Sequence, residues 1–318
     1  MSKQWAIWSA IALAAAASGS SAMAQEKIKV GFMLPFSGTY AALGVAIENG
    51  FRMQVAEQGG KLGGREIEYF KVDDESDPAK ATDNVNRLIK RDKVDVIVGT
   101  VHSGVAMAMA KAAKESGTVL IVPNAGADAV TGPMCAPNIF RSSFSNWQTA
   151  YPMGVVAAKE GKKNAMTLTW KYAAGEEAVN GFKEGFEKSG GKVSKQLTLP
   201  FPNVEFQALL TEIAAAKPDA VFSFFAGAGA VKFVKDYHAS GLSKTIPLYG
   251  PGFLTDGTLE ARLVACAEGS IQGEGAPELV ERDYAQHAVI SVATPVEGHA
   301  HRAWERFTPQ GPLAVLPC

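Results

Sequence analysis

The chain has 318 residues, of which 47% are hydrophobic and 20% charged, so it is long and apolar enough to bury the cores of two ordinary domains. Its 31 basic and 32 acidic residues nearly cancel, which excludes the strong positive field typical of proteins that bind nucleic acids or anionic membranes. An odd number of cysteines (Cys135, Cys266 and Cys318) leaves at least one thiol unpaired, and the sequence leaves open whether Cys135 pairs with Cys266.

The first 24 residues have the pattern of a cleavable export signal. Lys3 precedes an apolar run from Trp5 to Ala17, and Ala22-Met23-Ala24 forms a small-residue cleavage site. The run is shorter than the roughly 20 residues that span a bilayer, which disfavours the alternative of an uncleaved anchor helix. We therefore expect residues 1–24 to be a signal peptide and the exported protein to begin at Gln25, in the periplasm.

From Lys27 to Gly252, short apolar runs alternate with helical patterns. Parallel strands that are covered on both faces have this apolar, β-branched composition. The alternation predicts an α/β fold with parallel sheets flanked by helices. The expected strands are Ile28–Met33, Ile67–Val72, Val94–Val98, Val119–Val122, Ala165–Thr169, Val193–Leu197, Ala220–Phe224 and Ile246–Tyr249.

One helix start is marked clearly. Asp77 can cap a helix and Pro78 suits its first position, while Val85, Leu88 and Ile89 provide the apolar face. The acidic run before it, Asp73 to Asp77, lacks the glycine and distant glutamate of a calcium loop. We interpret this run as a loop between strand and helix whose acidic residues favour the helix N-terminus.

The strand–helix series divides at a polar, non-periodic stretch near Phe140–Gln148. We expect residues 25–140 to form lobe one, 141–249 lobe two, and 250–260 a return toward lobe one. The alternative is a long surface loop within a single large sheet.

No catalytic constellation is present in the sequence. Ser103 is followed directly by Gly104, so it lacks the spacing of a nucleophile elbow, and Gly161-Lys162 lacks the serine or threonine of a phosphate loop. The five histidines are scattered. We therefore expect a protein that is not an enzyme and that holds no cofactor or metal.

Loops after strand ends carry the candidate binding residues, because open α/β sheets bind ligands there. Gly99–Gly104 leads into a helix at which Ser103 can cap or meet an anion. Pro123–Ala127 is a second turn of small residues. Trp170, Tyr172 and Phe224 follow or end strands of the second half and could wall a pocket, although core packing explains Phe224 equally well.

Several motifs together resemble the periplasmic binding proteins of the branched-chain amino-acid type, the type I receptors of ABC importers. They are Leu34–Gly38, Gly59–Arg65, Asp73–Pro78, Gly99–Gly104 and Gly250-Pro251-Gly252, and the resemblance extends from about Lys27 to Glu260.

This resemblance implies two lobes that close by hinge motion on a small carboxylate, and a monomer that delivers it to an inner-membrane permease. The carboxylate would lie near Ser103 and Gly104 and the turn of Asn124, Ala125, Gly126 and Ala127. Tyr40 and Leu43 would lie at the cleft mouth. Tyr172, Ala174, Ala226 and Gly252 would be the lobe-two positions.

One position departs from the amino-acid-binding members of the family. In those members an acidic residue follows the Gly-Pro of the return strand and pairs with the ligand ammonium, whereas here Gly252 and Phe253 follow. A buried ammonium without a partner is costly. With aromatic side chains nearby, the sequence favours an aromatic, benzoate-like or otherwise apolar carboxylate; these side chains are Trp170, Tyr172, Phe225 and Phe253. An amino-acid receptor and an extracytoplasmic ligand-sensing module are the alternatives.

The last part of the chain differs in composition from the rest. No lysine follows Lys244, and residues 261–318 lack the regular strand–helix alternation. We expect 261–318 to be a divergent or altered tail that cannot complete both lobes, with poor folding and weakened ligand binding as consequences.

Overall fold

A computed structural model describes residues 26–255, 304–308 and 311–315. The chain divides into two compact units, Met1–Thr258 and Leu259–Cys318, which are described separately. The predicted signal peptide, Cys266 and Cys318 lie outside the described residues, as do most of the return segment's second half and most of the tail.

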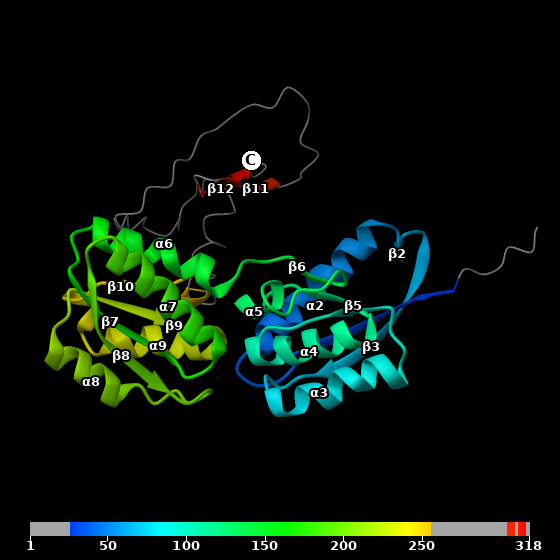
Figure 1. Ribbon diagram of the computed structural model, residues 1–318, viewed down its shortest axis with the longest axis horizontal. Helices are drawn as coiled ribbons and strands as arrows, with labels where there is room; N and C mark the ends of the chain where they lie inside the picture. Colours follow the sequence, from blue (N-terminus) through cyan, green and yellow to red (C-terminus); the bar gives the residue numbers. More distant parts are fainter. Residues whose placement is uncertain (1–25, 256–303, 309–310, 316–318) are drawn as a thin grey trace, which may run out of the picture. The chain divides into compact units, whose positions relative to one another are not determined.

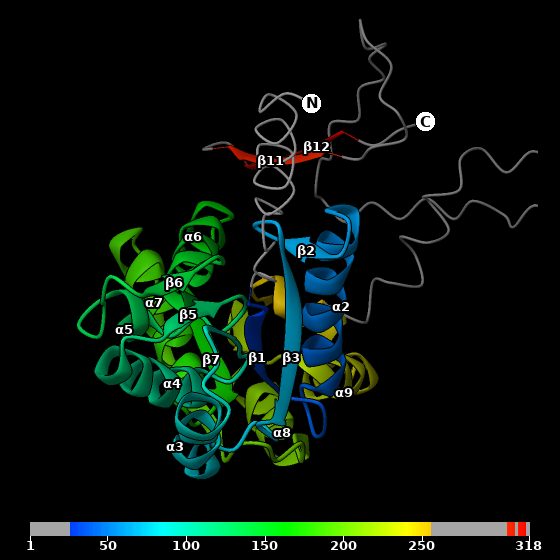
Figure 2. The same cartoon turned by 90° about the vertical axis from the view of Figure 1, so that its right-hand side faces the viewer.

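The first sheet of the larger unit has the strand order β2-β3-β1-β4-β5-β6. All neighbouring pairs are parallel except β2 and β3, which form an antiparallel hairpin. Helix α2 (Ala41–Glu57) lies on one side of β1 and β3, whereas α3 (Pro78–Asn86) and α4 (Ser103–Ser116) lie on the other (Figure 2). The strands are β1 (Ile28–Leu34), β2 (Lys61–Leu62), β3 (Arg65–Asp73), β4 (Val96–Val98), β5 (Val119–Val122) and β6 (Ile139–Arg141).

The second sheet has the order β10-β9-β7-β8 and is parallel throughout (Figure 1). Its strands are β7 (Asn164–Trp170), β8 (Lys192–Leu199), β9 (Ala220–Phe224) and β10 (Leu248–Tyr249). The helices around it are α6 (Asn146–Lys159), α7 (Ala173–Lys188), α8 (Gln207–Ala216) and α9 (Gly227–Ala239). Short helical segments complete the unit: α5 (Asp128–Thr131), η1 (Arg87–Arg91), η2 (Leu242–Lys244) and η3 (Gly252–Leu254).

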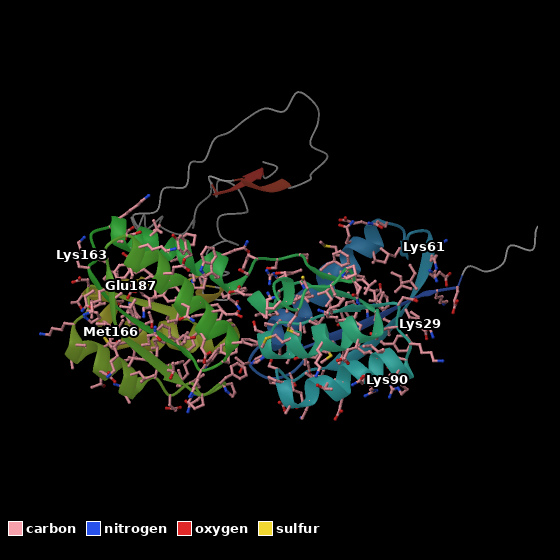
Figure 3. The ribbon with its side chains drawn as sticks, in the orientation of Figure 1. Lys29, Lys61, Lys90, Lys163, Met166 and Glu187 are labelled. Atoms are coloured by element: carbon pink, nitrogen blue, oxygen red, sulfur yellow. The ribbon has the colours of Figure 1, made fainter. Side chains whose placement is uncertain are left out.

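Each sheet has an apolar cluster on both faces. In the first sheet, Phe32 and Leu34 pack toward α2, whereas Ile97 and Leu120 pack toward α3 and α4. In the second sheet, Met166 and Phe222 belong to clusters on opposite faces. Figure 3 shows charged side chains such as Lys61, Lys90, Lys163 and Glu187 among those at the outer ends of the elements. The two-sided burial explains why the strands read as continuous apolar runs.

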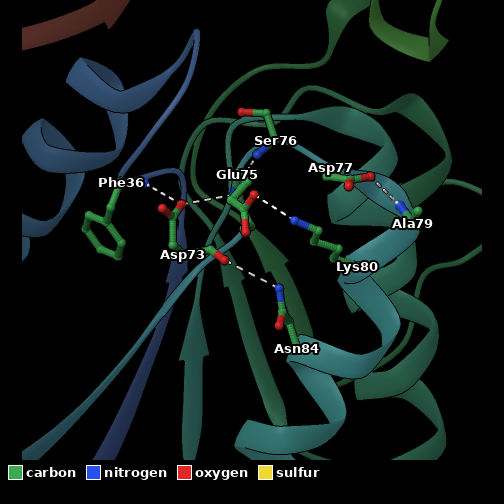
Figure 4. Close-up of polar contacts among 9 residues, drawn as sticks. Phe36, Asp73, Glu75, Ser76, Asp77, Ala79, Lys80 and Asn84 are labelled. Carbon is green, nitrogen blue, oxygen red and sulfur yellow. Dashed lines mark hydrogen bonds and ion pairs between the residues drawn. The ribbon is translucent and has the colours of Figure 1, made fainter.

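The acidic run is a strand-to-helix loop, as predicted (Figure 4). Asp77 caps α3 by accepting a hydrogen bond from Ala79 N at 2.9 Å, with Pro78 at the first helical position. Asp73 Oδ1 accepts from the backbone N–H groups of Phe36 and Glu75. Asp74 accepts from Ser76 N, and Glu75 pairs with Lys80, so each acid of this loop has a protein partner. Within the described ranges, no cluster of three metal-ligating side chains occurs.

The eight predicted strands correspond to strands of the structure, but the polar stretch near Phe140 differs from the expectation. Phe140 and Arg141 belong to β6, which pairs with β5, and α6 already begins at Asn146. The connection between the sheets is therefore confined to residues 142–145. Ser145 explains the early helix start, because it forms a capping box with Gln148.

The smaller unit contains, in its described residues, the strands β11 (Trp304–Thr308) and β12 (Gly311–Val315), which pair as an antiparallel hairpin. Cys135 is exposed, and its suggested partner Cys266 falls in the part that the structure does not describe. Among the described helices, none combines the length and the apolar character that a bilayer crossing requires.

Candidate functional site

A small cavity lies where the loops after β1, β4 and β5 of the first sheet meet those after β7 and β9 of the second. Its volume is about 20 Å³, room for roughly one water molecule. The residues around it are Tyr40, Val101, Ser103, Asn124, Gly126, Asn146, Tyr172, Ala174, Phe224, Ala226 and Phe253.

Eight residues proposed from the sequence line this cavity together: Tyr40, Ser103, Asn124, Gly126, Tyr172, Ala174, Ala226 and Phe253. Phe224, for which wall and core were equal alternatives, lines it as well. Sequence reasoning missed Val101 and Asn146. The Ser145–Gln148 capping box was the available signal for Asn146, because it marks this residue as the start of a helix.

The other proposed residues lie behind the cavity wall or away from it. Ala125 and Ala127 are buried among the residues that pack on α4, and Leu43 packs on the cluster beneath Tyr40. Gly104 N donates to the His102 side chain. Trp170 is fully buried, packs edge-on against Phe225, and donates through Nε1 to Asn203 O. Trp170 and Phe225 are therefore core residues.

Gly252 is exposed at the start of η3, and a side chain added there would meet no heavy atom within 4 Å. The lining residue of this segment is its neighbour Phe253. The ring of Phe253 packs against Phe224, with 6.1 Å between ring centroids.

Ser103 lies at the first position of α4, and the N-cap is His102, whose Nδ1 accepts from Gly104 N at 3.1 Å. The expectation that Ser103 caps this helix is therefore wrong. Because Ser103 does not cap α4, its buried hydroxyl faces the cavity and accepts a hydrogen bond from Asn146 Nδ2 at 3.3 Å. The remaining free N–H groups at the start of α4 give this end a partial positive charge.

Asn146 connects three elements. Its Nδ2 donates to Ser103 Oγ on α4 and, at 2.7 Å, to Glu177 Oε2 on α7. The other carboxylate oxygen of Glu177 accepts from Asp128 N at the start of α5, at 3.2 Å. Burial raises the pKa of Glu177, although the bond from Asn146 opposes that change.

Aromatic side chains from both sheets meet beside the cavity. The hydroxyl groups of Tyr40 and Tyr172 are 3.1 Å apart and share a hydrogen bond. The ring of Phe201 stacks on that of Tyr172, and His102 packs edge-on against Phe201. Burial lowers the pKa of His102 to about 4, so this imidazole is neutral near pH 7. Burial, followed by the neighbouring Tyr172, raises the pKa of Tyr40.

The cavity lining is neutral. Within the described ranges, its polar groups are the hydroxyls of Ser103, Tyr40 and Tyr172 and the carboxamides of Asn124 and Asn146, and no acidic or basic side chain contributes. The apolar part of the wall consists of the Phe224 and Phe253 rings and of small residues that let a ligand approach the backbone. Such a wall suits a flat apolar group with a hydrogen-bonding end.

A family model described as "Periplasmic binding protein" matches residues 27–288. The chain belongs to the periplasmic binding protein family. The match reaches beyond residue 260, where the sequence analysis placed the end of the resemblance, and the parallel sheets with flanking helices agree with the type I fold of this family.

Solved structures of similar proteins add detail to this assignment. An ABC-transporter solute-binding protein from R. palustris in complex with benzoate is 57% identical, with a TM-score of 0.72 over 76% of this chain and 66% of that one. A second, from Rhodopseudomonas palustris BisB5 in complex with 3,4-dihydroxybenzoic acid, is 33% identical, with a TM-score of 0.68 over 72% and 63% of the two chains.

A curated relative, the Leu/Ile/Val-binding protein homolog 6 of Brucella melitensis, is 30% identical over 82% of this chain. The chain spans 66% of the length of that relative.

Proposed function

We propose that this periplasmic binding protein is the receptor of an ABC importer and captures an aromatic carboxylate of the benzoate type. The observation that carries the proposal is the neutral cavity, which combines two phenylalanine rings with the Ser103 hydroxyl and contains no acidic or basic side chain among the described residues. The likeness to a benzoate-bound solute-binding protein supports the same ligand class.

The carboxylate would be held by neutral donors at the first-sheet side of the cavity. The Ser103 hydroxyl and the Asn124 side chain line the cavity there, and Ser103 is the first residue of α4. Hydrogen bonds from neutral donors to an anion are stronger than those between neutral groups, and the helix N-terminus adds a favourable partial charge. The ring would then lie against the Phe224 and Phe253 side chains that line the cavity.

An amino acid fits this lining less well, because its ammonium group needs a carboxylate partner. Gly252 and Phe253 occupy the segment in which the amino-acid-binding members carry an acid. Glu177 contacts the lining residue Asn146, but its oxygens already accept from Asn146 and Asp128 and it does not line the cavity. The Leu/Ile/Val-binding relatives nevertheless make a branched-chain amino-acid receptor the second candidate.

Export and delivery complete the proposal. Residues 1–24 would direct the chain to the periplasm and be removed, and the loaded protein would present its ligand to an inner-membrane permease, without chemistry on the ligand. The cavity of about 20 Å³ is too small for a benzoate ion, so entry requires the loops of the two sheets to separate and reclose around it.

Titration calorimetry on the full chain tests the ligand class, with benzoate, 4-hydroxybenzoate and leucine as probes. We expect the aromatic acids to bind and leucine to bind far more weakly. Phe253→Glu, which puts an acid at the lining residue of η3, should weaken benzoate binding more than Phe253→Gln does, through like-charge repulsion. Leucine binding as tightly as any aromatic acid would show that the amino-acid alternative is correct.

A further inference from the structure

Beside the proposed ligand site, the contacts of Ser103 raise the question of which way its hydroxyl hydrogen points. A serine hydroxyl donates one hydrogen bond and accepts up to two. In the described part of the chain, the partner of Ser103 Oγ is Asn146 Nδ2, which is a donor. The hydroxyl oxygen is therefore used as an acceptor, and its hydrogen remains available to a ligand.

This polarity depends on the orientation of the Asn146 carboxamide, which could in principle be reversed. The reversed orientation would place Asn146 Oδ1 against Glu177 Oε2, and two acceptors would face each other at the present 2.7 Å contact. It would also turn an acceptor toward Ser103 and so draw the serine hydrogen away from the cavity. The carboxylate of Glu177 therefore selects the orientation in which Asn146 donates to both neighbours.

Glu177 is itself held in place by a donor that cannot reverse. Its Oε1 accepts from the backbone N–H of Asp128, the first residue of α5. Both carboxyl oxygens of Glu177 thus act as acceptors, and each needs a donor facing it. The carboxamide of Asn146 is also enclosed, because a Cβ at Gly126 would lie only 2.4 Å from Asn146 Oδ1, and Asn146 N donates to Gly126 O.

We infer that Asn146 and Glu177 are positioning residues that turn Ser103 into an obligatory hydrogen-bond donor, and so make the site selective for a carboxylate over a neutral amide of the same shape. This inference rests on the proposed function, and it concerns selectivity within it. Glu177 acts on the ligand through Asn146 and Ser103, since it does not line the cavity.

Glu177→Gln is the most informative variant because it has two opposing effects on benzoate affinity. Redirection of the Ser103 hydrogen bond should lower the affinity, and removal of the Glu177 charge should raise it. The glutamine oxygen must still accept from Asp128 N, so its NH₂ group would face Asn146. The Asn146 carboxamide would then reverse, and Ser103 would donate to it instead of to the ligand. The simple electrostatic effect of removing a negative charge near the site would instead favour benzoate.

The experiment measures the dissociation constants of benzoate and benzamide by titration calorimetry on the full chain. We expect the benzoate-to-benzamide preference of the wild-type chain to fall about three- to tenfold in Glu177→Gln, the range for one redirected hydrogen bond. A preference that is unchanged or larger would overturn the inference. If the wild-type chain binds no aromatic acid, the proposed function itself is wrong, and the two failures are thus distinguishable.

A second variant tests the same connection through Ser103. Asn146→Asp keeps the side-chain shape, and its carboxyl group shares one proton with Glu177 at their 2.7 Å contact while it offers an oxygen acceptor to Ser103. Ser103 then donates to this carboxyl group, and the preference should fall at least tenfold. In a Ser103→Ala background, Asn146→Asp should lower the benzoate-to-benzamide preference by less than it does in the wild-type background. Equal effects in both backgrounds would mean simple charge repulsion and would contradict a route through Ser103. Thermal melting of each variant without ligand confirms that it is folded.

Discussion

At the scale of single residues, the site depends on which polar groups are already occupied. His102 takes the capping position that the sequence suggested for Ser103. Because His102 caps α4, the Ser103 hydroxyl is available to the proposed ligand. The cause is local: a histidine Nδ1 two residues before Gly104 can accept its N–H as well as a serine oxygen could. Nothing in the spacing of the motif distinguishes the two residues.

The first test concerns how much the Ser103 hydroxyl contributes to benzoate affinity. We expect Ser103→Ala to weaken benzoate binding by about 1–3 kcal/mol, because an anion buried in the cavity loses a charge-assisted hydrogen bond. Calorimetry supplies the dissociation constants. Ser116→Ala, at the exposed far end of the same helix, is the matched control and should bind as the wild type does. Equal affinities for wild type and Ser103→Ala would leave this hydroxyl without a role in binding.

His102 should make stability depend on pH. Its pKa is about 4 in the folded chain because of burial, against about 6.5 when unfolded, so between these values the unfolded state binds more protons. Stability from this residue is complete above about pH 6.5, is lost as the pH falls toward 4, and changes no further below that. The loss is about 3 kcal/mol at most.

Urea unfolding at several pH values between 4 and 7 measures this dependence. His102→Asn keeps a side chain that can cap α4 but does not titrate, so its stability should change less across the window. Asp77, whose charge raises the His102 pKa, is unchanged in the variant. Parallel pH profiles for the two proteins would show that burial of His102 does not shift its protonation.

At the scale of elements, the packing of α6 against α7 depends on glycines that the apolar periodicity of the sequence did not identify. Helices α6 and α7 approach each other so closely that glycines are needed at their contact. A Cβ at Gly154 of α6 would lie 2.2 Å from the backbone oxygen of Phe182, and one at Gly185 of α7 would lie 2.2 Å from that of Tyr151. A backbone atom cannot move aside as a flexible side chain can.

Two glycine-to-alanine changes in helices should therefore have opposite effects. Gly154→Ala should destabilise the protein by about 1–3 kcal/mol, since the helices must separate. Gly50→Ala in α2, where an added Cβ meets nothing within 4 Å, should stabilise it by about 0.5–1 kcal/mol through helix propensity. Chemical denaturation of both variants measures the free energies of unfolding. A neutral Gly154→Ala would contradict the close approach of these helices.

The bounds of strands could be predicted from the sequence more completely than the positions of loop and site residues. Strands such as Val119–Val122 and Ala220–Phe224 have the predicted bounds, because burial on both faces leaves a continuous apolar run that a single sequence shows directly. The positions of Asn146 and Trp170 depend instead on tertiary contacts. Asn146 lines the cavity from the start of α6, and Trp170 turns into the core, because the packing partners of both residues are distant in sequence. No local pattern contains that information.

At the scale of the larger unit, contacts across the two sheets determine whether the cavity is closed. Ala228 N donates to Thr39 O at 3.2 Å, and the Tyr40 and Tyr172 hydroxyls share a hydrogen bond. In the proposed function, release and entry of the ligand must break such contacts. Their strength therefore enters the binding constant as the cost or gain of closure, in addition to the contacts that the ligand itself makes.

The tyrosine pair provides the test of this view. Tyr172→Phe leaves the fully buried Tyr40 hydroxyl without its partner in the closed arrangement only, so we expect closure to cost about 1–2 kcal/mol more and benzoate affinity to fall by about five- to thirtyfold. Replacing both tyrosines with phenylalanine removes the unpaired group, and affinity should recover toward that of the wild type. Small-angle scattering of the unliganded single variant should show a more expanded protein than the wild type. If the double variant binds more weakly than either single one, the hydroxyls bind the ligand directly, and the closure argument is wrong.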